Sequence, residues 1–128
     1  MTRQQQYLSW AIDHIDEVAR SGKDVGDKYL SYCRNLPALV RACGLCQAMA
    51  FVEERADPRG GAEKKAYSLI RQHAAKVLGY EADRLLDEIR RAPLEQYMAM
   101  TRNLLAAWVY HKRLAEAKLD TGNSNGGR

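Results

Sequence analysis

Two cysteines separated by two residues form the motif with the clearest potential chemistry in this 128-residue sequence. Cys43-Gly-Leu-Cys46 has the spacing of thiol-disulfide oxidoreductases, in which a helix N-terminus lowers the pKa of the first thiol. Here the motif follows a predicted helix, no βαβ pattern surrounds it, and Leu45 stands where those enzymes commonly carry proline. The sequence therefore disfavours redox catalysis and leaves only some redox sensitivity of the pair open.

A structural zinc site is the second chemistry that these thiols could support. Zinc needs four soft ligands, and the third cysteine, Cys33, precedes the motif on a different predicted helix. The sequence has no second Cys-x-x-Cys pair, so a histidine would have to complete the site from afar. We expect no metal and no cofactor, and we interpret Cys43 and Cys46 as small side chains at a tight contact between helices.

The three histidines fall on three different predicted helices. His14 and His111 share the apolar stripes of their helices, which favours hydrogen-bonded imidazoles in the core. His73 is predicted to lie on the surface. GxSxG, HExxH, Walker and Asp-rich metal motifs are missing from the sequence. We therefore predict no catalytic residue and expect that the protein is not an enzyme.

The basic residues give the most useful functional signal. Lysine and arginine number 20 against 16 acids, a net charge of +4, and arginine's planar fork of donors suits bidentate contacts with phosphate. A groove built from several helices could follow a phosphate backbone without reading its sequence, although a solvated face explains any single cation equally well. The residues that we predict for RNA binding are Arg34, Arg41, Lys64, Lys65, Arg71, Arg102, Lys112 and Arg113.

Helices must position these side chains, because apolar residues recur at spacings of three and four along nearly the whole chain and no segment alternates like a strand. The length fits one domain. We predict an all-α, compact single-domain bundle of about six helices, over 3–20, 27–35, 45–55, 62–78, 81–91 and 94–118. Pro37 is expected to open a further short helix over 36–42, which Gly44 would end.

The ends of the chain and its apolar content suggest where the protein works. Residues 1–119 are predicted to form the helical domain, and residues 120–128, with nothing to bury, a disordered tail. No uninterrupted apolar run reaches the roughly 18 residues of a membrane span, and the N-terminus lacks a signal-peptide core. We expect a cytoplasmic protein with free thiols and no membrane contact.

The helices on either side of Gly44 also suggest a DNA-binding helix-turn-helix. Glu53 falls where such a unit needs an apolar residue, and Gln47 is the only good base-reading side chain near the start of the second helix. The motif is therefore partial, and a helix-turn-helix regulator remains a less favoured alternative.

Several short motifs occur in a consistent order between about residues 3 and 118. They comprise Tyr7 and Trp10 on the first helix, then Leu36-Pro37-Ala38-Leu39-Val40, Gly44-Leu45, Gln47-Ala48 and Ala50-Phe51, then Tyr67 to Leu78, and finally Glu95-x-Tyr97-Met98-x-x-Thr101-Arg102 before a helix with Trp108 and Arg113. Together they resemble the small α-helical subunit of the Cmr-type (type III-B) CRISPR RNA-guided effector complex. Cys46 departs from that family, whose members often carry glycine there.

The resemblance implies a non-catalytic subunit in antiviral defence. It would stack in several copies beside the backbone subunits, with the large subunit also present, and would help to form the channel in which guide RNA and target RNA pair. Among the predicted RNA-binding residues, the family motif supports only Arg102 and Arg113; the other six rest on charge and helical spacing. A scaffold whose arginines pair with acids of neighbouring subunits, without RNA contact, is the main alternative.

Overall fold

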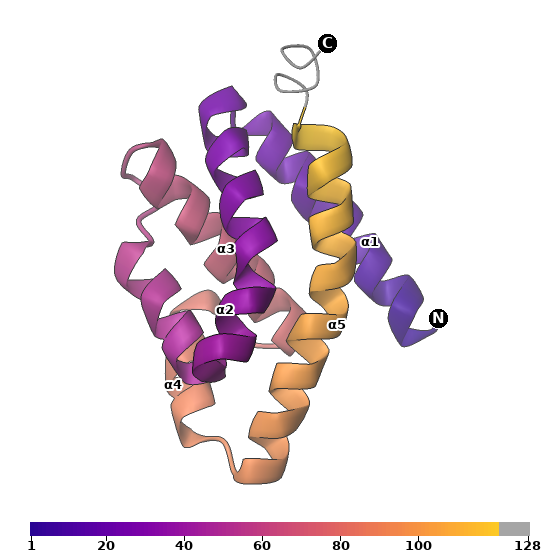
Figure 1. The fold of residues 1–128 in the computed structure, drawn as a ribbon, viewed down its shortest axis with the longest axis vertical. Helices are drawn as coiled ribbons and strands as arrows, with labels where there is room; N and C mark the ends of the chain where they lie inside the picture. Colours follow the sequence, from indigo (N-terminus) through magenta and orange to yellow (C-terminus); the bar gives the residue numbers. More distant parts are fainter. Residues whose placement is uncertain (121–128) are drawn as a thin grey trace.

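The computed structural model describes residues 1–120, and in this part of the chain every regular element is helical (Figure 1). The predicted all-α class is therefore confirmed. Of the predicted tail, residues 121–128 lie outside the described residues. The elements are α1 (Arg3–Arg20), α2 (Lys23–Arg55), α3 (Ala62–Leu78), a short 3₁₀ helix η1 (Ala82–Arg84), α4 (Leu85–Arg91) and α5 (Leu94–Leu119).

Helix α1 has the predicted bounds, because capping groups fix both of its ends. The Thr2 hydroxyl accepts a hydrogen bond from the backbone N–H of Gln5, whose side chain accepts one from the N–H of Thr2. This reciprocal capping box satisfies amides that have no partner inside the helix. The apolar stripe of α1 is buried against the rest of the protein and consists of Tyr7, Ala11, Ile15 and Val18.

Helix α2 corrects one prediction, since Pro37 lies inside a helix rather than at the start of one. Proline has no N–H, so it cannot donate to the Cys33 carbonyl four residues earlier. The Trp108 indole N–H from α5 donates to that carbonyl at 3.1 Å instead. A side chain far away in sequence thus satisfies the backbone group that proline leaves without its usual partner.

Gly44 divides α2 into two arms, as the sequence predicted. Its φ of 86° and ψ of 163° lie in a region that is essentially restricted to glycine. Just beyond the break, the Tyr97 hydroxyl of α5 accepts a hydrogen bond from the Cys46 N–H at 3.0 Å. In Figure 1 α2 descends through the centre of the view, and its second arm, in magenta, rises on the left.

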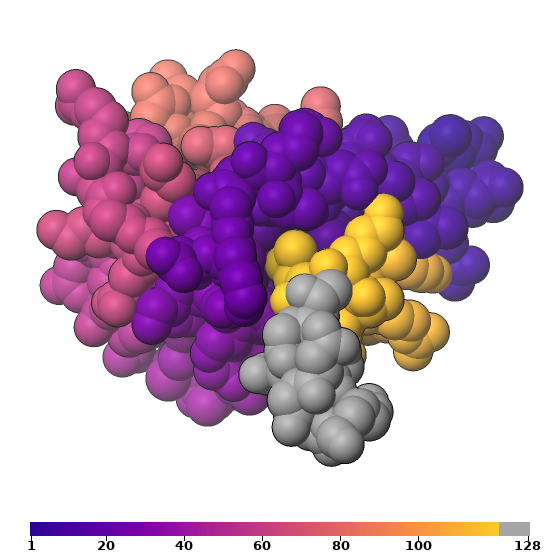
Figure 2. Space-filling view, turned by 90° about the horizontal axis from the view of Figure 1, so that it is seen from above, coloured from indigo at the N-terminus to yellow at the C-terminus, as the bar shows by residue number. Residues whose placement is uncertain are grey.

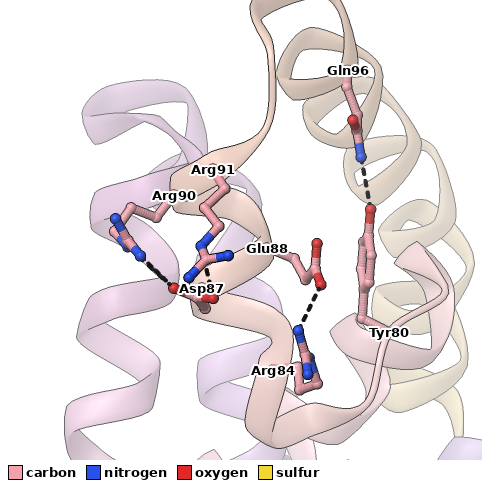
Figure 3. Close-up of polar contacts among 7 residues, drawn as sticks. All are labelled: Tyr80, Arg84, Asp87, Glu88, Arg90, Arg91 and Gln96. Atoms are coloured by element: carbon pink, nitrogen blue, oxygen red, sulfur yellow. Dashed lines mark hydrogen bonds and ion pairs between the residues drawn. The ribbon is translucent and has the colours of Figure 1, made fainter.

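Helices α3 and α4 follow, and the predicted helix over 81–91 proves to be η1 continued by α4. Gly79 ends α3 in the left-handed conformation, as predicted. Arginines of η1 and α4 pair with acids on the same segment: Arg90 and Arg91 with Asp87, and Arg84 with Glu88 (Figure 3). The Gln96 side chain donates to the Tyr80 hydroxyl and ties the first turns of α5 to the end of α3 (Figure 3).

Helix α5 packs against both α1 and α2, so its inward face forms the centre of the core. Helices α1 and α5 run in the same direction, because Arg3 donates to Asn103 and Lys118 pairs with Asp16. The C-terminal end of α5, in yellow, lies between α2 and α1 when the molecule is seen from above (Figure 2). Trp108 is completely buried where these helices meet.

One helix of residues 1–120, α2, is long and apolar enough by length and composition to cross a membrane. Core helices of soluble proteins pass the same test, so the match is weak evidence. Gly44 breaks α2 into two arms, and its buried apolar residues, such as Leu36, Val40 and Leu45, belong to the core of the protein. The geometry favours a core helix over a membrane span.

Candidate nucleic-acid interface

Three of the eight predicted RNA-binding cations surround one hollow between α2 and α5. The hollow measures about 230 Å³, and Arg41, Lys112 and Arg113 contribute to its lining. All three side chains lie at the surface, and none forms an ion pair within residues 1–120. Pro37 and Trp108 provide apolar lining beneath them. The fold thus gathers three cations that are available for phosphate contacts.

Arg34 lies beside this hollow with its charge already compensated. Its guanidinium pairs with Glu116 at 3.1 Å and with Asp120 at 3.4 Å. Glu116 is also the acid among the lining residues of the hollow. Arg34 therefore neutralises the acid that would otherwise repel a phosphate group, and the cations around the hollow remain in excess.

Arg102 lies farther along the exposed side of α5. It precedes Arg113 by eleven residues, which is about three helical turns, so both side chains project from the same face. Val109 lies between them on this face and is half exposed. The face of α5 next to the hollow thus carries both of the cations that the family motif supported.

The other three predicted cations lie away from the hollow. Arg71 of α3 is mostly buried and pairs with Glu53 at 2.7 Å. Lys64 and Lys65 belong to the first turn of α3, and Lys65 lines a separate hollow beside Gly22 and Gly61. All three residues therefore belong to α3, whereas the hollow with Arg41, Lys112 and Arg113 lies between α2 and α5.

The sequence interpretation missed a second cluster, which we call the histidine network. It comprises His14 and Glu17 from α1, Tyr29 from α2, His73 from α3 and His111 from α5. The prediction that His73 lies on the surface is wrong, because only 1% of it is exposed. Its spacing from Ile70 and Val77, three residues on one side and four on the other, was the signal for burial.

Hydrogen bonds define which ring nitrogens carry protons in the histidine network. The Glu17 carboxylate can only accept, so His73 donates to it from Nε2 at 3.0 Å and accepts from the Tyr29 hydroxyl at 2.7 Å. His111 donates from Nδ1 to the Ala107 carbonyl at 3.0 Å and accepts from His14 Nδ1 at 2.8 Å. The rings of His73 and His111 are therefore neutral in this arrangement, and His14 donates from Nδ1.

Burial favours these neutral rings. It lowers the pKa of His14 from 6.5 to about 2 and that of His111 to about 4, with further lowering by neighbouring histidines. Burial also lowers the pKa of His73, although the hydrogen bond to Glu17 opposes the shift. The His14 and His73 rings stack at 4.0 Å with an interplanar angle of 4°.

Within residues 1–120 no three acidic, histidine or cysteine side chains are arranged to hold a metal ion.

The cysteines are not the tight packing elements that the sequence suggested. Cys43 and Cys46 are both exposed, on either side of the break at Gly44. Cys33 is buried, which raises the pKa of its thiol and leaves it unreactive. The glycine, and not the cysteine pair, determines the local structure of the motif.

Comparison with known proteins places this arrangement in a family. The family described as CRISPR-associated protein (Cas_Cmr5) matches residues 3–118. This chain belongs to the Cas_Cmr5 family. The CRISPR system Cmr subunit Cmr5 of Thermus thermophilus is 38% identical over 120 residues, which cover 93% of this chain and 97% of that protein. The sequence resemblance to the Cmr-type small subunit is thereby confirmed.

The fold agrees with a solved structure of the same family. The crystal structure of a Cmr5 family protein from Thermus thermophilus matches with a TM-score of 0.76 and 36% sequence identity. The match covers 91% of this chain and 97% of the other. The family match therefore includes the helices that form the hollow and the helices that contribute to the histidine network.

Proposed function

We propose that this protein is a non-catalytic small subunit of a Cmr-type CRISPR effector complex and that the hollow between α2 and α5 contacts RNA. Its partners would be further copies of itself, the backbone and large subunits, and guide and target RNA in the cytoplasm. Base pairing would read the sequence, so the protein needs only to hold phosphates.

The observation that carries this proposal is the convergence of Arg41, Lys112 and Arg113 on one hollow. These cations come from two helices that are far apart in sequence, and the acid beside them is already paired with Arg34. An exposed cation that is not paired with a neighbouring acid can bind a phosphate group. Binding then releases the counterions that had condensed on the RNA. Arg102 extends the same basic face along α5.

The test replaces Arg41, Lys112 and Arg113 with alanine and measures target-RNA retention by the assembled complex at several salt concentrations. Each lost phosphate contact reduces the salt slope by about 0.7 to 0.9, so we expect a reduction of about two to three for the triple variant. A matched control replaces Arg84, Arg90 and Arg91, which changes the net charge equally at a different place. Normal assembly with an unchanged slope in the first variant would contradict the proposal.

A protein scaffold without RNA contact is the second candidate, and exposed apolar side chains favour it. Leu94, Met98 and Val109 on α5 are 72%, 51% and 50% exposed. Such a row suits contact with another subunit. Ultraviolet crosslinking of the assembly distinguishes the candidates, because adducts between RNA and α5 require direct contact.

A strong preference of the isolated chain for one duplex DNA sequence would instead favour the helix-turn-helix alternative.

A further inference from the structure

The histidine network contacts the residues that support the basic hollow. The His111 ring stacks on Trp108 with centroids 4.6 Å apart and an interplanar angle of 3°. Trp108 in turn donates to the Cys33 carbonyl below Pro37, and both Trp108 and Pro37 line the hollow. A change in the position of His111 would therefore act directly on the lining of the hollow.

The network cannot take up several protons and keep its geometry. A proton on His111 Nε2 would place it opposite the His14 Nδ1–H, so two donors would face each other without an acceptor. A charge on His73 would lie against the stacked His14 ring at 4.0 Å. Within residues 1–120, His73 is the one ring of the three that contacts a carboxylate, Glu17, which could stabilise a positive charge. Further protons require the rings to separate.

The charged and titratable groups around the rings come from every helix that packs on them. His14 faces His73 and Lys76 on α3 and His111 on α5, while Glu17 lies near Arg20 on its own helix. On α2 the neighbouring groups are Tyr29 and Cys33, whose pKa values burial raises. Glu17 is the acid that hydrogen-bonds to the network, so these surroundings offer little stabilisation for two charged rings.

We propose that the histidine network is a proton-sensitive support for the basic hollow, which acidification opens by separating α1 from α3 and α5 and releasing Trp108. This inference rests on the proposed function only for its effect on RNA, which would be held less tightly as the pH falls. Weaker RNA binding at low pH distinguishes opening of the network from a simple charge effect. Protonation of histidines near a basic surface, without opening, would strengthen RNA binding.

The pH range follows from linkage. An opened network has histidines with ordinary pKa values near 6.5, whereas the closed network lowers these values. The open form therefore binds more protons below pH 6.5, and the closed form loses stability as the pH falls below that value. Between pH 7.5 and 5.5 the open population should rise about tenfold for each histidine that takes up a proton on opening.

The first experiment follows solvent exchange of the Trp108 indole N–H by nuclear magnetic resonance on the full chain. Its hydrogen bond to the Cys33 carbonyl protects it in the closed form. Because each histidine that titrates on opening contributes about tenfold, protection corrected for intrinsic exchange should fall about tenfold or more between pH 7.5 and 5.5. Constant protection over this range would overturn the proposal.

The second experiment measures target-RNA retention by the assembled complex over the same pH range at constant ionic strength. Assemblies contain either the wild-type subunit or His14→Gln, whose amide retains a donor toward His111 but does not titrate. The pH responses of the other subunits then cancel in the comparison. The open population should rise about tenfold less on acidification with the variant, since one titrating ring is removed. We therefore expect retention to fall on acidification with the wild-type subunit and to fall less with the variant.

The outcomes separate this inference from the proposed function. If Trp108 loses protection but the assembly retains no target RNA at any pH, the proton response stands and the RNA role is wrong. If Trp108 loses protection while retention is constant or rises, the link between network and hollow is wrong. If the variant does not fold, the wild-type exchange measurement decides whether the network opens.

Discussion

Replacing Trp108 with phenylalanine tests how α2 tolerates a proline in its interior. The substitution keeps an aromatic ring but removes the indole N–H that lies 3.1 Å from the Cys33 carbonyl. That carbonyl is buried, and Pro37 has no N–H to offer it. The variant therefore leaves a buried acceptor without its donor and also creates a small cavity.

The magnitude follows from the cost of an unpaired buried group. Loss of the donor to a buried carbonyl costs about 1–3 kcal/mol, and the smaller ring adds a packing loss of about 1 kcal/mol or more. Pro37→Ala supplies a backbone N–H at the position that normally donates to Cys33. Replacing proline by alanine in a helix interior stabilises the helix by up to about 3 kcal/mol, and this gain applies to both the wild-type and the Trp108→Phe protein. We expect it to recover about 1–3 kcal/mol more in the Trp108→Phe protein, because the new N–H replaces the lost donor.

Urea unfolding followed by circular dichroism gives the four free energies of this double-mutant cycle. Pro93→Ala is a matched control, because Pro93 precedes α5 and lies fifteen residues before Trp108. It should show no coupling with Trp108→Phe. A coupling energy between Pro37→Ala and Trp108→Phe within about 0.5 kcal/mol of zero would refute the compensation that we infer.

The remaining predictions concern the motif around Gly44. Gly44→Ala should destabilise the protein by about 1–3 kcal/mol in urea unfolding, because its φ of 86° is strained for alanine. Gly61→Ala, at a φ of −69°, should cost less than about 1 kcal/mol, because it only replaces a favourable N-cap residue. Equal effects would count against a special role for Gly44. Cys43→Ser with Cys46→Ala should leave the unfolding free energy within about 0.5 kcal/mol of wild type, since both thiols are exposed. Zinc bound by wild type but not by this variant, measured by atomic absorption, would contradict our interpretation of the cysteine pair.

Local patterns predicted most of the helices because their causes are local. The spacing of Tyr7, Ala11, Ile15 and Val18 requires only that one helix face be apolar, so α1 follows from the sequence alone. Gly44 and Gly79 were equally readable, since a positive φ is a property of a single residue. Pro37 was misinterpreted for the opposite reason, because the group that accommodates it comes from another helix.

The candidate site was less predictable. Charge composition pointed to a phosphate-binding surface but could not distinguish Arg41, which is exposed beside the hollow, from Arg71, which pairs with Glu53. Likewise, helical spacing could have placed His73 inside, but nothing local shows that it meets His14 and Tyr29. These assignments depend on partners from other helices.

By itself, the sequence determined the helical class, most helix boundaries, the break at Gly44 and the motifs of the family. Each depends on residues within a few turns of one another, or on short patterns read in order. The tertiary structure alone decided that Trp108 compensates Pro37, that three histidines share one network, and that Arg41 joins Lys112 and Arg113. These features require residues up to 97 positions apart to meet, and only the packing of the helices brings them together.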